Sequence, residues 1–267
     1  MPIKVQTFAT AAEAAQALSA SRSARFLGGG TVLMRAVNEA DPGFDTIVRT
    51  TDPALSAIRA SGGTVSIGAA VTMAEIARHR ETAFLAPVAR VIGGPQVRAA
   101  ATAAGNLFAV PPYGDFAGAL LALDATAETS DGRRQSIEDV LRAPNGTPSP
   151  MIAHIHVPAP RDGLHFAKIS RVKPKGVSLM SIAAVVPRSG GRVENARIVF
   201  NGMGPKPMRS SGAERALNGA PLDSAAIGRA KAQAADGLDP ADDPVASAWY
   251  RREVAGVHLG RLLEGIR

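Results

Sequence analysis

Two glycine-containing stretches are the most informative part of this sequence, Leu27-Gly28-Gly29-Gly30-Thr31 and, much later in the chain, Thr102-Ala103-Ala104-Gly105-Asn106. Both stretches follow apolar residues. Because glycine has no Cβ, successive backbone N–H groups can turn toward a bulky anion without steric cost. A single glycine triplet is more often a tight turn than a binding site. The pair of stretches, taken together, indicates a site for a bulky anion such as a phosphate.

The first stretch is typical of a strand, a turn and a helix, but it matches neither common nucleotide motif. Arg25-Phe26-Leu27 precedes the glycines, and Thr31 opens Val32-Leu33-Met34. The spacing is not G-x-G-x-x-G, and no acidic residue ends a second strand about 20 residues later, so a Rossmann domain is not expected. Gly-Lys-Ser/Thr is absent as well. The sequence therefore excludes a P-loop too.

The composition is that of a globular protein. The chain has 267 residues, of which 46% are hydrophobic and 20% charged, and this length accommodates two domains. The apolar runs from Ala117 to Leu123 and from Ile182 to Val186 are too short to cross a bilayer. Met1-Pro2-Ile3-Lys4-Val5 shows neither an apolar signal region nor a twin arginine. We therefore expect a cytoplasmic protein without a membrane span.

Cysteine is absent, and this excludes several kinds of chemistry at once. Without thiols the chain forms no disulfide, thiolate nucleophile, cysteine-ligated zinc site or protein-bound iron–sulfur cluster. Electron transfer would need a bound organic cofactor. His154 and His156 alternate on one expected strand, but no third ligand follows nearby, so no metal site is expected. A G-x-S-x-G elbow is also absent, which argues against serine hydrolysis.

The net charge of +7 invites a nucleic-acid interpretation that the distribution of charges does not favour. Basic residues are scattered and become dense only from Lys168 to Lys175. No aromatic residues alternate with them to stack on bases. A solvated basic face, a dinucleotide-type cofactor or an acidic partner protein would each explain the charge.

The hydrophobic pattern predicts mixed helices and strands. Thr10-Ala11-Ala12-Glu13 and Thr72-Met73-Ala74-Glu75 are capping boxes, and Asp115 is placed to cap an apolar helix that starts at Phe116. Turn-forming residues 143–150 separate this part from an antiparallel meander, whose second and third strands are joined by Gly190-Gly191. The expected helices end near 18, 79, 91 and 123, and others follow at 212–217, 224–235 and from 245. The expected strands are 26–27, 46–48, 65–69, 152–157, 166–170, 178–186 and 196–200.

These segments, read in order, resemble a known family. The resemblance rests on residues 26–31, 67–76, 92–98, 102–107, Asp115 and 121–125, and on Trp249-Tyr250-Arg251-Arg252 near the end. In order and spacing they are similar to the FAD-binding medium subunit of the molybdenum hydroxylases, the group that includes xanthine dehydrogenase and carbon monoxide dehydrogenase. The resemblance implies an α+β fold. It consists of a two-subdomain FAD-binding domain (PCMH-type) over residues 1–160, divided at about 55, and a C-terminal domain of a small antiparallel sheet plus helices over 161–267.

The resemblance also implies the cofactor contacts, with no catalytic residue and no metal in this chain. In the family both glycine stretches cradle the FAD pyrophosphate, and the position of Asp115 binds the far end of the cofactor through hydrogen bonds. Lys168 falls in the family's Lys-x-x-Arg segment near the flavin, and Ile152 falls where an apolar residue packs on the isoalloxazine. The expected cofactor-binding residues are Leu27, Gly28, Gly29, Gly30, Thr31, Ala101, Thr102, Gly105, Asn106, Phe108, Asp115, Ile152 and Lys168.

Three positions depart from the family pattern. Val32 replaces the usual aspartate after Gly-Gly-Thr, Ala104 replaces a glycine, and Ala99 replaces an asparagine after Arg98. An alanine at position 104 permits a tight loop only if its φ is negative. These departures concern single contacts with the pyrophosphate rather than membership of the family.

The resemblance implies an oxidoreductase subunit that transfers electrons. Its FAD would accept electrons from iron–sulfur clusters and pass them to an external acceptor; the organic substrate and the acceptor stay open. Partners would be a small subunit with 2Fe–2S clusters and a large molybdopterin subunit, in a dimer of heterotrimers. Two alternatives stay open: a stand-alone flavoprotein reductase, for which we find no serine–glutamate pair, and a non-enzymatic basic binding module.

Overall fold

The computed structural model describes residues 3–40, 43–109, 112–142, 150–160, 162–172 and 176–266. The chain forms two compact units. The N-terminal unit comprises Met1–Ala109 and Asp124–Pro158, and the C-terminal unit comprises Val110–Leu123 and Ala159–Arg267. Residues 143–149 of the expected turn region, Pro111 and residues 173–175 of the basic run lie outside the described residues.

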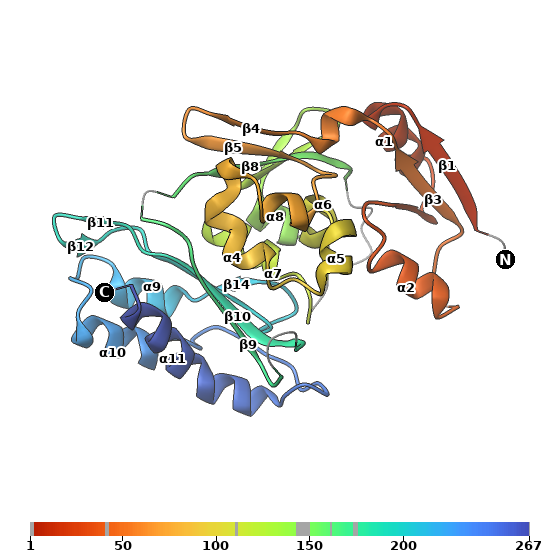
Figure 1. Ribbon diagram of the computed structural model, residues 1–267. Helices are drawn as coiled ribbons and strands as arrows, with labels where there is room; N and C mark the ends of the chain where they lie inside the picture. Colours follow the sequence, from red (N-terminus) through yellow and green to blue (C-terminus); the bar gives the residue numbers. More distant parts are fainter. Residues whose placement is uncertain are drawn as a thin grey trace. The chain divides into compact units, whose positions relative to one another are not determined.

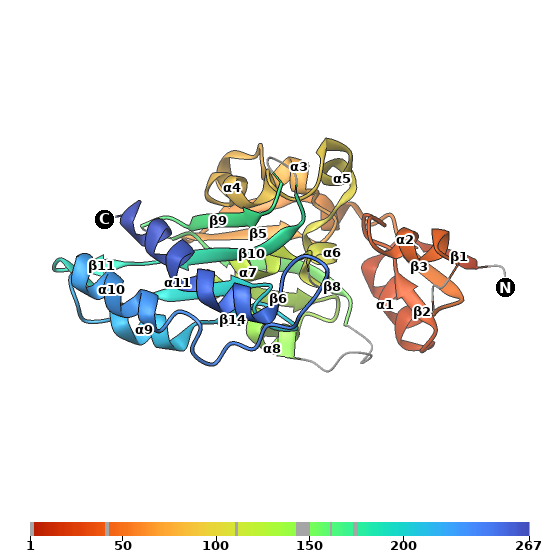
Figure 2. The ribbon, with the colours of Figure 1, turned by 90° about the horizontal axis from the view of Figure 1, so that it is seen from below.

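A three-stranded parallel sheet begins the N-terminal unit (Figure 2). The capping box at Thr10 and Glu13 is confirmed and starts the helix α1, which packs on this sheet through Ala14, beside Ala24 and Val48. The strand order is β1-β3-β2, and both pairings are parallel. The elements are β1 (Lys4–Phe8), α1 (Ala11–Ser19), β2 (Ala24–Phe26), α2 (Leu33–Asn38) and β3 (Thr46–Thr50).

A five-stranded antiparallel sheet forms the rest of this unit, in the order β4-β5-β8-β6-β7. Burial alternates along β8, where Ile155 and Val157 are buried while His154 and His156 lie on the partly exposed face. The strands are β4 (Ile58–Ser61), β5 (Thr64–Gly68), β6 (Thr126–Thr129), β7 (Arg134–Ser136) and β8 (Ile152–Pro158). The helices are η1 (Pro53–Ser56), α3 (Met73–Ile76), η2 (Arg80–Leu85), α4 (Ala86–Ala89), α5 (Pro95–Ala100), α6 (Ala103–Leu107) and α8 (Ile137–Arg142).

Two details of the helices differ from the sequence prediction. The second capping box is confirmed, but the helix it opens ends at Ile76, because a turn and the His79 cap of η2 follow. The helix that was expected to end near residue 91 is followed by Gly93-Gly94-Pro95. Pro95 starts α5, because proline has a fixed φ that suits the first turn of a helix and needs no N–H partner there.

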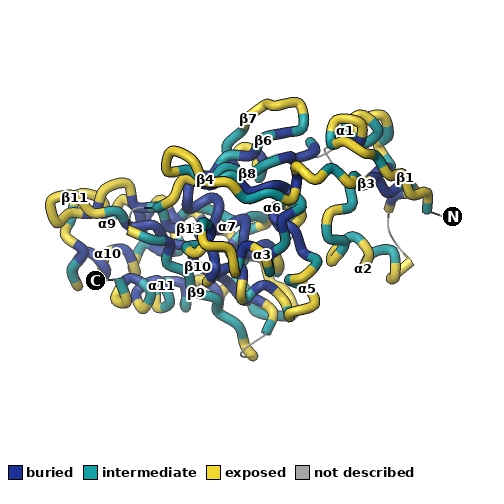
Figure 3. Tube along the Cα trace, turned by 45° about the horizontal axis from the view of Figure 1, so that its top comes forward, coloured by how far each residue is buried: buried dark blue, intermediate teal, exposed yellow. Residues whose placement is uncertain are grey.

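The C-terminal unit is built on a four-stranded antiparallel sheet in the order β14-β13-β10-β9. Helix α7 covers one face and helices α9, α10 and α11 cover the other (Figure 1), so every residue of β10 is buried (Figure 3). The elements are α7 (Asp115–Ala122), β9 (His165–Ser170), β10 (Ser178–Val185), β11 (Arg188–Ser189), β12 (Arg192–Val193), β13 (Arg197–Asn201), β14 (Met208–Arg209), α9 (Ser211–Leu217), α10 (Ser224–Ala232) and α11 (Ala248–Glu264).

The predicted meander and fold class are confirmed. Strand β10 pairs antiparallel with both β9 and β13, and Gly190-Gly191 turns a small hairpin between β11 and β12. Over the described residues the chain is therefore α+β, with one three-stranded parallel sheet, a five-stranded and a four-stranded antiparallel sheet, and the two-stranded hairpin of β11 and β12. Among the helices of the described ranges, none is long and apolar enough to cross a membrane. The predicted boundaries at 55 and 160 stay a prediction.

Candidate functional site

The two glycine stretches lie in contact within the N-terminal unit. A Cβ built on Gly28 would lie 2.8 Å from Thr102 Oγ1, and one on Gly29 would lie 1.7 Å from the carbonyl oxygen of Ala100. Gly30 has a φ of +71°, which disfavours residues with a side chain. The close approach of the backbone at Ala100, the last residue of α5, thus explains why position 29 carries no side chain.

The first stretch carries free backbone donors. Leu27 N–H donates to the Val48 carbonyl at 2.8 Å, which extends the pairing of β2 with β3. In the part of the chain that the structure describes, the next four N–H groups, from Gly28 to Thr31, donate to no protein acceptor. These residues are exposed or half-buried. A run of free N–H groups on a glycine turn fits a diphosphate.

The backbone donors of the second stretch are committed to the fold. Ala103 and Ala104 N–H donate to the carbonyls of Val71 and Ala69, at 2.8 and 3.2 Å. Thr102 is the N-cap of α6, and its hydroxyl accepts from Gly105 N–H at 3.2 Å. Ala104 lies inside α6 and is not among the residues with positive φ, so the loss of a glycine there causes no strain. The second stretch is a rigid support for the first.

The other residues of the N-terminal unit that were predicted to contact FAD differ in solvent exposure. Ala101 is buried, and its carbonyl accepts from Met73 N–H at 2.8 Å. Phe108 follows α6 and is 40% exposed, whereas Ile152 begins β8 and is 3% exposed. Val32 leaves α2 without a side-chain cap. The assignment of Ala101, Phe108 and Ile152 to FAD stays a prediction, as it does for Thr102, Gly105 and Asn106.

In the C-terminal unit Asp115 is the centre of a buried polar cluster. Asp115 does not cap α7 as expected: Gly114, with a φ of +89°, is the N-cap. The Asp115 carboxylate instead accepts from side chains of the sheet below. Ser181 Oγ donates to Asp115 Oδ1 at 2.7 Å, Asn201 Nδ2 donates to the same oxygen at 3.3 Å, and Lys168 Nζ lies 2.9 Å from Oδ2.

The strand register explains how these side chains meet. Ser181 on β10 pairs with Lys168 on β9 and with Asn201 on β13, so the three stand in one row across the sheet. Asp115 is 3% exposed, and the side chain of Lys168 is 17% exposed. A buried carboxylate requires such compensation, because burial without partners is costly. The structure thus brings together two predicted site residues, Asp115 and Lys168.

The sequence prediction did not include Ser181 or Asn201. Each is a polar residue in an otherwise apolar strand, within Leu179-Met180-Ser181-Ile182 and after Ile198-Val199-Phe200. A polar residue at a core position needs a buried partner, and that was the signal available from the sequence. Finding the partner requires the pairing of the strands.

The two histidines of β8 share a carboxylate. His156 Nε2 lies 2.9 Å from Glu128 Oε2, His154 Nδ1 lies 3.9 Å from Oε1, and Arg134 Nε also contacts Oε2 at 2.9 Å. Burial raises the pKa of Glu128, but the hydrogen bonds and charges of Arg134 and His156 together outweigh it, and the pKa is lowered. Across the described ranges, no group of three or more metal-ligating side chains could hold a metal ion.

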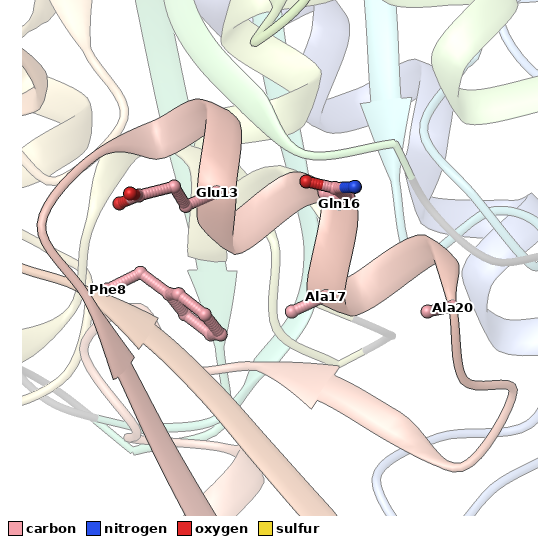
Figure 4. Close-up of a pocket in the computed structure, with 5 residues that line it drawn as sticks. All are labelled: Phe8, Glu13, Gln16, Ala17 and Ala20. Carbon is pink, nitrogen blue, oxygen red and sulfur yellow. The ribbon is translucent and has the colours of Figure 1, made fainter.

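A surface hollow of about 320 Å³ lies beside α1 (Figure 4). Phe8, Glu13, Gln16, Ala17 and Ala20 line it, and Glu13 is already engaged in the capping box. None of these residues belongs to the glycine stretches or to the Asp115 cluster. The hollow is separate from the candidate site.

Comparison with known proteins identifies the family. A family profile described as "FAD binding domain in molybdopterin dehydrogenase" matches residues 1–160, and one described as "CO dehydrogenase flavoprotein C-terminal domain" matches residues 165–266. The chain belongs to the FAD-binding medium subunits of the molybdenum hydroxylases. FAD is the cofactor of this family's domain, and the chain is an oxidoreductase subunit. The sequence-based resemblance is confirmed.

Named members of this molybdenum hydroxylase family are similar over most of their length. The carbon monoxide dehydrogenase medium chain of Afipia carboxidovorans is 30% identical over 222 residues, which cover 79% of this chain and 77% of that one. The glyceraldehyde dehydrogenase medium chain of Sulfolobus acidocaldarius is 27% identical over 214 residues, covering 76% of each chain. The crystal structure of Cu,Mo-CO dehydrogenase in its cyanide-inactivated form matches with a TM-score of 0.89 and 26% identity, covering 99% of this chain and 98% of that one.

Proposed function

We propose that this chain is the electron-transfer subunit of a multi-subunit molybdenum hydroxylase, taking electrons from iron–sulfur clusters of a partner and passing them to an external acceptor. The observation that supports it best is the run of four free N–H groups from Gly28 to Thr31 in a chain of this family. When bound, FAD supplies a redox centre that is stable in one-electron and two-electron forms.

The chain's own residues would divide the work of holding the cofactor. The N–H groups of Gly28, Gly29, Gly30 and Thr31 would donate to the diphosphate, where the glycines allow close approach. The Asp115 carboxylate would accept hydrogen bonds from polar groups of the cofactor. Lys168, a cation paired with that carboxylate, favours the reduced and more negatively charged form of the flavin.

The absence of cysteine supports a division of labour among subunits. This chain has no thiolate for an iron–sulfur cluster, so the clusters and the molybdopterin belong to a small and a large partner. Relatives carry names such as "6-hydroxypseudooxynicotine dehydrogenase complex subunit alpha" from Paenarthrobacter nicotinovorans, which is 30% identical over 224 residues. We extend the proposal to the whole complex, which would be a dimer of such heterotrimers in the cytoplasm.

The test is to purify the chain alone and in the complex that copurifies with it. The isolated chain is expected to bind one FAD, to accept electrons from dithionite, and to turn over no organic substrate. The complex is expected to contain iron and molybdenum by elemental analysis. Hydroxylation by the isolated chain without either metal, or a chain that takes up no FAD, would contradict the proposal.

A further inference from the structure

We infer that Ser181 and Asn201 are positioning residues that orient the Asp115 carboxylate for the cofactor. The inference rests on the proposed function, because it takes Asp115 as a cofactor contact. Both residues act on a single atom, Asp115 Oδ1, through the hydrogen bonds of 2.7 and 3.3 Å. With Oδ1 occupied by two donors, Oδ2 is left facing Lys168.

Solvent exposure indicates which side of the cluster a ligand can reach. Ser181 and Asn201 are each 2% exposed, whereas the side chain of Lys168 is 17% exposed. Access to the carboxylate is therefore from the side of Oδ2 and the lysine. Ser181 and Asn201 cannot touch a ligand themselves from this position, so any effect they have on binding passes through Asp115.

The orientation of the Asn201 side-chain amide costs stability, and a residue that served packing alone would not require that orientation. Its Nδ2 donates to Asp115 Oδ1 and to the Tyr113 carbonyl, at 3.3 Å each. Because both partners are acceptors, the amide cannot be turned over, and the buried Oδ1 of Asn201 has no hydrogen-bond partner among the described residues. An unpaired buried acceptor is destabilising. The amide is thus placed for its NH₂ group, which fixes the carboxylate and the turn before it.

The test measures FAD affinity by flavin fluorescence and stability by urea unfolding on the full chain. Ser181→Ala is expected to weaken FAD binding about tenfold, the value of one hydrogen bond to a charged group. Ser178→Ala is the matched control: Ser178 is on the same strand and 4% exposed, and its hydroxyl has no partner among the described residues. This control is expected to bind FAD like the wild type.

A double-mutant cycle separates positioning from mere packing. In an Asp115→Ala background, Ser181→Ala is expected to change FAD affinity less than twofold, because its target is gone. Asn201→Ala is expected to weaken FAD binding and also to lower stability, because the hydrogen bonds to Asp115 Oδ1 and to the Tyr113 carbonyl are both lost. Ser181→Thr, which keeps the hydroxyl, is expected to retain most of the affinity.

The outcomes distinguish this inference from the proposed function. If the wild type binds FAD and Ser181→Ala binds it equally well, or if the effects of Ser181→Ala and Asp115→Ala simply add, the positioning role is wrong. If the wild type takes up no FAD, or Asp115→Ala binds it as tightly as the wild type, the assignment of Asp115 fails and this inference falls with it.

Discussion

At the scale of single residues, the backbone at Gly29 leaves no room for a side chain. A Cβ there would lie 1.7 Å from the carbonyl oxygen of Ala100, which belongs to rigid backbone ahead of α6. Gly29→Ala is therefore expected to lower the free energy of unfolding by about 2 kcal/mol or more, as other substitutions that overpack a contact do. Urea unfolding followed by circular dichroism measures this loss.

Gly228→Ala is the control for Gly29→Ala. Gly228 lies within α10, has no neighbouring atom within 4 Å of a built Cβ, and lacks a positive φ. Alanine is favoured over glycine in a helix, so stability is expected to rise by up to about 1 kcal/mol. If Gly29→Ala keeps full stability but loses FAD, the glycine is required for the cofactor rather than for the packing of the two stretches.

Arg251 is a buried cation that donates four hydrogen bonds. Its Nε donates to the Leu179 carbonyl at 3.1 Å, its Nη1 to the carbonyls of Ala241 and Ala246, and its Nη2 to Asp243 Oδ2 at 2.8 Å. Lysine has the charge but not the planar fork. Arg251→Lys is expected to destabilise the chain by about 2 kcal/mol, measured as a shift in the urea midpoint.

The neighbouring arginine provides the comparison. Arg252 pairs with Asp239, whose side chain is 91% exposed. Exposed ion pairs contribute little, so Arg252→Lys is expected to change stability by less than about 0.5 kcal/mol. Equal losses for the two substitutions would show that the hydrogen bonds of Arg251 do not anchor α11 to the sheet.

At the scale of elements, the partly exposed face of β6 and β8 predicts a pH dependence. Burial raises the pKa of Glu128, but the hydrogen bonds and charges of Arg134 and His156 together outweigh it, so the pKa is lowered. A carboxyl group with a lowered folded-state pKa stabilises the protein above its unfolded pKa, and this stabilisation is lost as the pH falls through the folded value. Stability is therefore expected to fall on acidification below about pH 4.

Glu128→Gln tests that expectation. The variant cannot ionise at position 128, so its unfolding free energy between about pH 5 and pH 3 is expected to fall less steeply than that of the wild type. Glu138→Gln is a suitable control, because Glu138 is 52% exposed in its pair with Arg142. Identical pH profiles for Glu128→Gln and the wild type would show that the pair contributes nothing.

At the scale of the whole molecule, the excess of basic residues predicts how the chain meets its partners. With a net charge of +7, association with acidic partner surfaces is expected to be steered electrostatically. Raising the salt concentration from about 0.05 to about 0.5 M should slow association of the purified chain with the copurified partner subunits at least several-fold. Surface plasmon resonance measures this rate, and a salt-independent rate would exclude a role for the charge.

Much of the architecture is contained in local sequence patterns. Thr10 and Thr72 begin helices because their hydroxyls and the glutamates three residues later satisfy the free ends of a helix within four residues of chain. Gly190-Gly191 closes a hairpin because both residues adopt positive φ. The glycine stretches could likewise be recognised from local sequence, because the absence of a side chain is visible in the sequence itself. The capping boxes, the hairpin turn and the glycine stretches each depend on residues that are close together in the chain. The sequence alone therefore determined them, and it also determined the family.

The tertiary structure alone decided which distant residues meet. Asp115 was expected to cap its own helix, but packing of α7 on the sheet of the C-terminal unit presents the carboxylate to Lys168, Ser181 and Asn201 instead. Glu128 joins His154 and His156 only through the pairing of β6 with β8. Strand register and helix packing are set cooperatively by the burial of whole faces, and a shift of one residue would turn each side chain to the opposite face. No local pattern contains that choice, which is why the polar clusters emerged only from the folded chain.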